Sequence, residues 1–504
     1  MSSPLKLLYS TTKTMLRDHH NYFPIWCQRA PLRLLIALSL ASAAPAAARA
    51  ASVIQPPPLL QPPPPARLEA SDFLQRLARM HVGGTLSLNW RNVGPEKPGF
   101  ETQVQNEVYL ADMYFGVDGP FVDGVPVQVE AHLPTGGKGT MILNQLNFGY
   151  KKIDDWLFQF GKFVVPYGRY NELYRPDQFL TVTRPLLYAS PDTLDLVIRL
   201  NSPRPPVSLG YTDIGARASY YPPVNEVFVP EEVTFFVVNG LGESTNRLRT
   251  FPNIDFLGVP NIPGNGTTID FGHQDNNLAD NNNNKAFGGR MVFSLGDLRF
   301  PWPIPEGASD LKGVNMGLSA MDGQYDLEDT LTYQMYAADW SFDYLGFDFS
   351  GEYEYSATQF KDPLLNSNGT VAAPTQFARD FEVDQGYFVQ ASAPILRAPR
   401  LGQRLTGVAV FNQLWRRGPI QDLLLNATID GTTYPSVNGL RSDSYRATTR
   451  MDKYTVGLNY QLSDHFTFKF DYSYWVMGRA ATRSVTSIGN LDIYQGAFSM
   501  VMAF

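Results

Sequence analysis

Residues 466–474, Phe-Thr-Phe-Lys-Phe-Asp-Tyr-Ser-Tyr, decide the fold. Aromatic side chains occupy every second position, and every residue between them is polar. Because successive side chains of a β-strand point to opposite faces, this alternation predicts a strand with one apolar and one polar face. The preceding stretch 454–462 alternates in the same way, and 347–355 and 125–133 follow the pattern closely.

Similar stretches recur along the chain from residue 81 onward. Apolar faces rich in aromatic residues suit the two interfaces of a bilayer. Inside lipid, the unpaired N–H and C=O groups of an open sheet edge have no water to bond, so the sheet must close into a barrel. We therefore predict an all-β transmembrane antiparallel β-barrel of about 16 strands, with 14 to 18 allowed. The candidate strands are 82–91, 104–116, 125–133, 141–151, 156–164, 211–220, 232–239, 286–295, 312–321, 332–344, 346–356, 384–393, 405–416, 453–462, 465–476 and 492–504.

The connections between these strands alternate in length. The long gaps 165–210, 240–285, 357–383 and 417–452 all follow odd-numbered strands, and several of the other connections are tight. This asymmetry is typical of barrels with short periplasmic turns and long extracellular loops.

Composition excludes other classes of protein. The chain of 504 residues has 41 Lys+Arg against 48 Asp+Glu, a formal charge of −7, and no basic run, so we expect no nucleic-acid partner. Aromatic residues make up 13% and charged residues only 18% of the chain, and 41 Gly with 38 Pro leave little room for long helices.

The first 80 residues have a different character from the rest. Residues 1–50 read as a leader with a secretory signal peptide: Arg29 and Arg33 precede a short apolar core, and Ala48-Arg49-Ala50 is a cleavage site of small residues. Residues 51–80 form a Pro-rich periplasmic linker whose last part is either a short helix or a disordered tail, and 81–504 form the barrel. The single cysteine, Cys27, lies in the leader, so no disulfide or Cys metal site is expected after cleavage near Ala50.

The C-terminal strand ends the chain on an aromatic residue. Five apolar side chains share one of its faces, and this pattern resembles the C-terminal signal that the barrel assembly machinery reads in Gram-negative outer-membrane barrels. These residues are Tyr494, Phe498, Met500, Met502 and Phe504.

Two motifs flank the long gap after the fifth strand: residues 160–169, Phe-Gly-Lys-Phe-Val-Val-Pro-Tyr-Gly-Arg, and residues 211–217, Tyr-Thr-Asp-Ile-Gly-Ala-Arg. With the barrel pattern, the chain resembles the Gram-negative outer-membrane porin superfamily, nearest to its phosphate-selective (O/P-type) branch, although no array of Arg and Lys matches a phosphate ladder. The resemblance implies a passive diffusion channel for small hydrophilic or ionic solutes, embedded in outer-membrane lipids. It further implies a homotrimer with the third extracellular loop folded into the barrel. We expect no cofactor.

That loop, about 168–210, is stiffened by prolines and carries leucines that suit burial against the barrel wall. We expect it to form the pore constriction; a surface loop or a trimer-contact loop is the alternative. Its charged residues are Arg169, Glu172, Arg175, Asp177, Arg184, Asp192, Asp195, Arg199 and Arg204.

Polar positions on the strands supply further charges, and the acidic ones on 332–344 and 346–356 are expected to lie opposite the basic residues of the loop. Opposed charges at a constriction create a transverse electric field that discriminates between solutes, whereas scattered charges only keep the lumen hydrated. The residues expected to face the lumen are Glu130, Arg217, Arg290, Asp339, Asp343, Asp348, Glu352 and Lys469.

Other functions fit the residues less well. No histidine has a nearby serine and acid in a recognisable catalytic arrangement, so we expect no enzyme. The Asn/Asp-rich stretch 275–284 lacks the spacing of a defined calcium loop and reads as a solvated loop, so no metal is expected. An outer-membrane receptor or adhesin, using the long loops as its working surface, is the alternative to a porin.

Overall fold

The computed structural model describes residues 79–95, 105–134, 141–151, 153, 155–188, 206–207, 209–223, 229–241, 285–299, 310–324, 331–360, 380–398, 402–418, 428–429, 432–433, 447–477 and 491–504. The leader 1–50, the linker up to residue 78 and the stretch 275–284 lie outside these residues. The same holds for four charged residues of the predicted constriction loop, namely Asp192, Asp195, Arg199 and Arg204. Predictions that concern these parts stay predictions.

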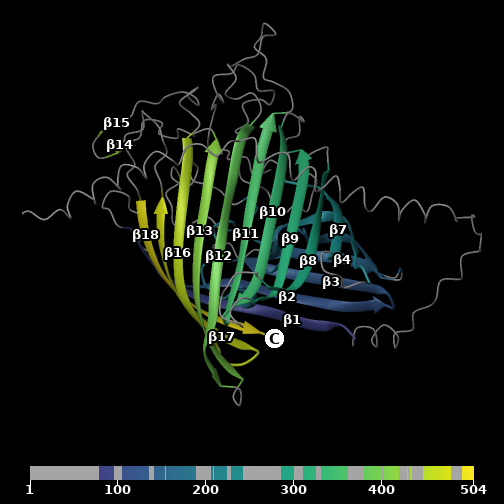
Figure 1. Cartoon of the computed structure of the whole chain (residues 1–504), viewed down its shortest axis with the longest axis horizontal. Helices are drawn as coiled ribbons and strands as arrows, with labels where there is room; N and C mark the ends of the chain where they lie inside the picture. Colours follow the sequence, from purple (N-terminus) through teal and green to yellow (C-terminus); the bar gives the residue numbers. More distant parts are fainter. Residues whose placement is uncertain are drawn as a thin grey trace, which may run out of the picture. The chain divides into compact units, whose positions relative to one another are not determined.

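Sixteen strands form a closed antiparallel barrel, in which β1 pairs with β18. Figure 1 shows the later strands side by side, from β8 to β18. The first eight strands are β1 (His81–Pro95), β2 (Gln105–Val122), β3 (Val125–Pro134), β4 (Ile142–Tyr150), β5 (Trp156–Val164), β6 (Thr212–Tyr220), β7 (Pro230–Val238) and β8 (Ala286–Arg299). The other eight are β9 (Asp310–Gln324), β10 (Leu331–Tyr344), β11 (Phe347–Phe360), β12 (Asp380–Ala398), β13 (Gln403–Gly418), β16 (Ala447–Gln461), β17 (Phe466–Met477) and β18 (Leu491–Ala503).

Little else in the described residues is regular. A separate hairpin pairs β14 (Thr428–Ile429) with β15 (Thr432–Thr433). The helices α4 (Arg169–Glu172) and η3 (Pro176–Gln178) follow β5. No helix in the described part of the chain is long and apolar enough to span a membrane.

The predicted strand count and closure are confirmed, and each candidate strand overlaps one strand of the barrel. Several strands extend beyond the alternating residues; β12, for example, begins at Asp380 rather than at residue 384. Backbone pairing continues there because the hydrogen-bond ladder needs no apolar side chain. The tight turn Leu345-Gly346 has φ of 54° and 81°, and this pair of positive φ angles matches the twist of the flanking strands β10 and β11.

The barrel buries polar side chains and exposes apolar ones. On β17, Lys469 is 2% and Asp471 0% exposed, whereas Phe470 is 46% and Tyr472 45% exposed. The adjacent β16 repeats this arrangement. A water-soluble protein places apolar side chains inside, so the outer face of this barrel is suited to a lipid environment.

The seam between the first and last strands is closed by backbone hydrogen bonds. The Gly84 N–H donates to the Phe504 carbonyl oxygen at 2.9 Å, and the Phe504 N–H donates to the Gly84 carbonyl oxygen at 3.0 Å. A Cβ on Gly84 would lie 2.9 Å from Cζ of Phe504 and closer still to the Tyr114 carbonyl oxygen. The terminal aromatic ring therefore packs over a position that only glycine fits.

We expect Gly84→Ala to destabilise the barrel by about 1–3 kcal/mol, because the added methyl group must displace backbone or ring atoms at the seam. Gly496→Ala on β18 is the matched control, since a Cβ there meets nothing within 4 Å. The measurement is the temperature at which the compact, heat-modifiable gel band is lost. Equal midpoints for the two variants would show that the ring and the glycine do not constrain closure.

Candidate functional site

Residues 165–188, the crossing segment, connect β5 towards β6 and hydrogen-bond to opposite sides of the barrel. The Thr85 hydroxyl on β1 donates to Asp177 at 3.0 Å, and the Gly168 N–H donates to the Ser319 hydroxyl on β9 at 3.2 Å. In the closed ring of sixteen strands, β1 and β9 lie opposite each other. A segment that reaches both must run through the interior of the barrel.

Local sequence explains how the crossing segment turns. Gly168 adopts φ 71°, and a Cβ there would collide with the Glu352 carboxylate and lie 2.5 Å from the Tyr188 hydroxyl. Asn171 ties the ends of the connection together: its amide nitrogen donates to the Val165 carbonyl oxygen at 2.8 Å, and its oxygen accepts the Tyr211 N–H at 2.7 Å. The segment is therefore held by its own side chains as well as by the wall.

Apolar side chains fill much of the space around the crossing segment. Leu186 and Leu187 are 1% and 0% exposed, and they belong to one buried cluster with wall residues such as Phe388 and Leu414. Burial of large apolar side chains stabilises this position by about 1.5–3 kcal/mol each. The crossing segment is thus packed, and it does not hang loosely in the lumen.

Buried charges on β16 and β17 bind the backbone of the crossing segment. The Asp471 carboxylate accepts the Val182 and Thr183 N–H groups at 2.7 and 2.8 Å. The Lys469 ammonium donates to the carbonyl oxygens of Pro176 and Phe179, and Lys453 donates to the Arg184 carbonyl oxygen at 2.7 Å. These charge-assisted bonds satisfy backbone groups that would otherwise be buried without partners.

The arginines of the crossing segment pair with β2 and β3. Arg175 binds the carboxylate of Glu130, which is 1% exposed. Arg184 lies 2.5 Å from Asp112, whose other oxygen is 2.9 Å from His132 Nε2. These two arginines therefore have acidic partners of their own, and they do not face the acidic residues of β10 and β11 as the sequence led us to expect.

The acidic residues of β10 and β11 have different partners. Asp339 accepts from the buried Arg290 guanidinium at 2.6 Å, and Glu172 of the crossing segment lies 3.7 Å from Arg290. Enclosure within the barrel raises the pKa of Glu172, although its side chain is 40% exposed, and Arg290 and Arg217 oppose that shift. The Glu352 carboxylate accepts the Tyr170 N–H at 3.1 Å and the Tyr188 hydroxyl.

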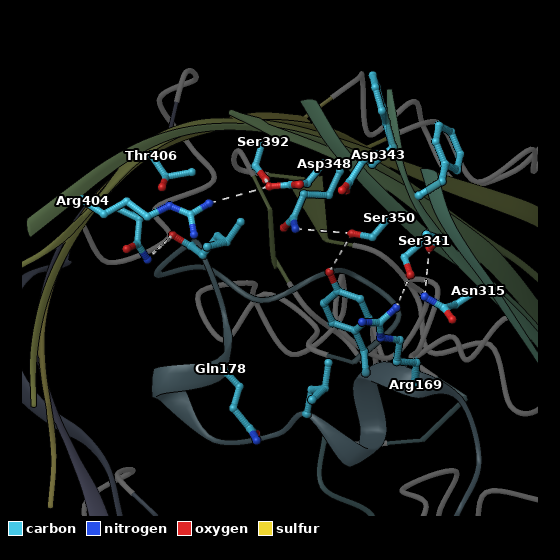
Figure 2. Close-up of a pocket in the computed structure, with 18 of the residues that line it drawn as sticks. Arg169, Gln178, Asn315, Ser341, Asp343, Asp348, Ser350, Ser392, Arg404 and Thr406 are labelled. Carbon is cyan, nitrogen blue, oxygen red and sulfur yellow. Dashed lines mark hydrogen bonds and ion pairs between the residues drawn. The ribbon is translucent and has the colours of Figure 1, made fainter. Parts of the chain in front are cut away.

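A polar cavity of about 510 Å³ lies between the crossing segment and the wall. Figure 2 shows Arg169 and Gln178 on the segment side, with Ser350, Asp348 and Arg404 on the wall side. Arg169 donates to the Ser341 hydroxyl at 2.5 Å, and Arg404 lies 3.8 Å from Asp348. The wall residues come from β9 to β13 and from β16, and most of them carry hydroxyl, amide or charged groups.

Within the cavity, Asp343 and Asp348 flank the Leu345-Gly346 turn as direct cross-strand partners. Arg217 lies away from the cavity lining, on β6, where it donates to Gln159. Among the described residues, no group of three or more His, Cys, Asp or Glu side chains is placed to hold a metal ion. The cavity can therefore offer hydrogen bonds and both signs of charge to a polar solute.

Sequence reasoning missed several residues that fix the crossing segment, namely Asp112, Asp471 and Lys453. Asp471 occupies a polar position of the alternating stretch 466–474, and Lys453 directly precedes the stretch 454–462. The alternation therefore predicts the strands that carry these two residues. Nothing in the sequence indicates their partners, which lie hundreds of positions away in the case of Lys453 and Asp471.

No family model matches the chain, and no curated protein sequence matches it. Among solved structures, the chain is similar to an anion-selective porin from Comamonas acidovorans, with 9% identity, TM-score 0.45, and coverage of 84% of this chain and 99% of that chain. OmpT, an outer membrane protein of Vibrio cholerae solved as a trimer form, shows 11% identity, TM-score 0.43, and coverage of 84% and 99%. The outer membrane channel DcaP of Acinetobacter baumannii shows 9% identity, TM-score 0.42, and coverage of 84% and 97%. At these identities the similarity concerns the barrel fold alone.

Proposed function

We propose that this chain is an outer-membrane porin, a passive channel for small hydrophilic or ionic solutes in a Gram-negative bacterium. One observation carries the proposal: the closed barrel is polar inside and apolar outside, as Lys469 and Asp471 against Phe470 and Tyr472 illustrate. Such polarity suits a wall between lipid and a watery lumen. The crossing segment would narrow that lumen, and the polar cavity beside it would admit the solute.

The charges of the cavity bear on the solute class. Arg169 and Arg404 are balanced by Asp343 and Asp348, so the cavity favours neither ionic sign strongly. Of the other arginines, Arg175, Arg184 and Arg290 each have a carboxylate partner. A free row of arginines for phosphate is therefore missing from the described residues, and we propose a weakly selective channel instead of a phosphate-selective one.

Further parts of the proposal concern the surroundings of the barrel. Its apolar outer face would contact outer-membrane lipids and, in a homotrimer, the neighbouring barrels. Phe498 on β18 and Phe504 just after it are 40% and 51% exposed on that face, where the barrel assembly machinery could reach them. The leader 1–50 would direct export.

Conductance across a planar lipid bilayer tests the proposal. We expect the purified, heat-modifiable barrel to insert and to give discrete conductance steps without any ligand, with a reversal potential near zero in a salt gradient. A protein that stays soluble in the periplasm would refute the barrel's placement in a membrane. A stable barrel that is electrically silent but binds a host or phage protein would favour the receptor or adhesin alternative.

A further inference from the structure

Two glutamates on β11 lie side by side beneath the crossing segment. Glu352 and Glu354 are two residues apart, so their side chains project from the same face of the strand. Both are 0% exposed. Each carboxylate placed in such a site without partners costs several kcal/mol in lost hydration.

The two carboxyl groups differ in their hydrogen bonds. Glu352 accepts from the Tyr170 N–H and from the Tyr188 hydroxyl, one donor for each oxygen. Neither oxygen of Glu354 has a hydrogen-bond partner among the described residues, and the same is true of the buried Tyr167 hydroxyl. Two hydrogen bonds favour the ionised form of Glu352. A charge on Glu354 has only the nearby Tyr188 hydroxyl to oppose it, and that hydroxyl already donates to Glu352.

The titratable groups around the pair are two neutral phenols and one further carboxyl group. From the crossing segment, Tyr167 and Tyr188 face it, and burial beside the two carboxyl groups raises the pKa of both phenols well above their usual value, so they remain neutral. From β10, Asp339 is the cross-strand partner of Glu352.

Arg290 on β8, whose charge acts on Glu352, is already bonded to Asp339 at 2.6 Å and lies 3.7 Å from Glu172. On β12, the register partners of Glu352 and Glu354 are Phe388 and Gly386, which carry no charge. Further along β12 and β13, the buried Arg416 is the register partner of the acidic Asp384. Glu354 therefore has no cation as its register partner on either neighbouring strand.

We propose that Glu354 is protonated and shares its proton with Glu352, and that this acid pair is a proton-dependent latch holding the crossing segment across the barrel. The carboxyl O–H of Glu354 donates to the Glu352 carboxylate, which keeps lone pairs free beyond its two present donors. Tyr170 and Tyr188 lie near the two ends of the crossing segment, and both bind Glu352. Loss of the proton to water leaves two adjacent carboxylates, and their repulsion releases both ends. The proposal deepens the proposed function by adding regulation of the same lumen.

The direction of the pH effect follows from proton linkage. The docked segment holds one proton that the released segment gives up, so docking is favoured at low pH and lost progressively as pH rises. The equilibrium between docked and released forms changes by up to about tenfold per pH unit, the limit for one proton.

Thiol labelling reports release without requiring conduction. Leu187 is 0% exposed under the docked segment, and Leu345 in the tight turn is 63% exposed. In the full chain with Cys27→Ser, the labelling rate of Leu187→Cys is divided by that of Leu345→Cys at each pH, which cancels the titration of the thiol itself. Leu186→Cys, at a position 1% exposed, serves as a second reporter if the first variant does not give a heat-modifiable barrel.

We expect this ratio to rise at least tenfold from about pH 6 to about pH 10. Glu354→Gln should hold the ratio low at every pH, because the amide stays neutral and can donate to Glu352. Glu107→Gln, at a side chain 41% exposed and paired with Arg91, should titrate like the parent protein.

A flat ratio in the parent protein, or a Glu354→Gln variant that titrates like the parent, would overturn the latch. A ratio that depends on added Ca²⁺ at fixed pH would also overturn it, by assigning the pair to a cation instead of a proton. If the barrel does not conduct but the labelling ratio rises with pH as expected, the proposed channel is refuted and the latch is retained. If the barrel conducts but the labelling ratio does not change with pH, the latch is refuted and the channel is retained.

Discussion

Replacing residues 169–187 with a short Gly/Ser linker is expected to raise single-channel conductance at least about threefold. The crossing segment hydrogen-bonds to wall residues on opposite sides of the barrel and packs Leu186 and Leu187 into a buried cluster. Its removal frees that cross-section for water and ions. The strand ladder remains closed without it, because β1 and β18 pair directly.

The same replacement exposes the lumen groups that now bind the segment, including Lys469, Asp471 and Glu352. Water then hydrates their charges, so we expect the barrel to persist. We expect its thermal unfolding midpoint to fall, because the contacts between the segment and the wall are lost. Deleting a similar length from the connection 361–379 controls for the effect of shortening a loop. Unchanged conductance after replacement of 169–187, with the barrel still heat-modifiable, would show that the crossing segment does not limit ion flow.

Arg175→Ala is expected to lower the free energy of unfolding by about 2 kcal/mol, measured by urea titration in detergent. Its partner Glu130 is 1% exposed and would be left buried without its cation, a change that usually costs about 3–5 kcal/mol. We expect less here because the Arg175 side chain is 33% exposed and water can partly replace it. Tyr174 and Asn144 still donate to Glu130 and limit the loss further.

Adding Glu130→Gln to Arg175→Ala should recover most of that loss, since a neutral amide needs no cation. The matched control is Arg450→Ala, which removes an arginine 52% exposed and paired with Asp452 at 2.9 Å. Equal destabilisation by the two single Arg→Ala changes, or no recovery in the double variant, would argue that the Arg175–Glu130 pair does not anchor the segment.

Part of the candidate site could be predicted from the sequence. The charged residues and prolines of the loop 168–210 single it out, and the polar positions of the strands point to residues such as Glu130 and Lys469. Their partners are another matter. Arg175 binds Glu130 on β3, and Arg184 binds Asp112 on β2, instead of facing the acidic residues of β10 and β11. The charge count of the loop is the same in either arrangement, so composition cannot distinguish them.

The sequence by itself determined the strands, their number to within two, and the closure of the barrel. Alternation of side chains is a local property with a period of two residues, and stretches such as 466–474 carry it without reference to any other part of the chain. Closure follows because a sheet in lipid cannot leave backbone groups unpaired at an edge.

Only the tertiary structure decided the path of the crossing segment and the burial of the two carboxyl groups of Glu352 and Glu354 next to it. Bonds such as Val182 to Asp471 and Leu186 to Asn412 join residues that are remote in the chain. They exist because barrel closure brings distant strands around one enclosed space, where buried donors and acceptors must find partners. Glu354 lacks such a partner among the described residues, which no reading of the alternating stretch 347–355 could reveal.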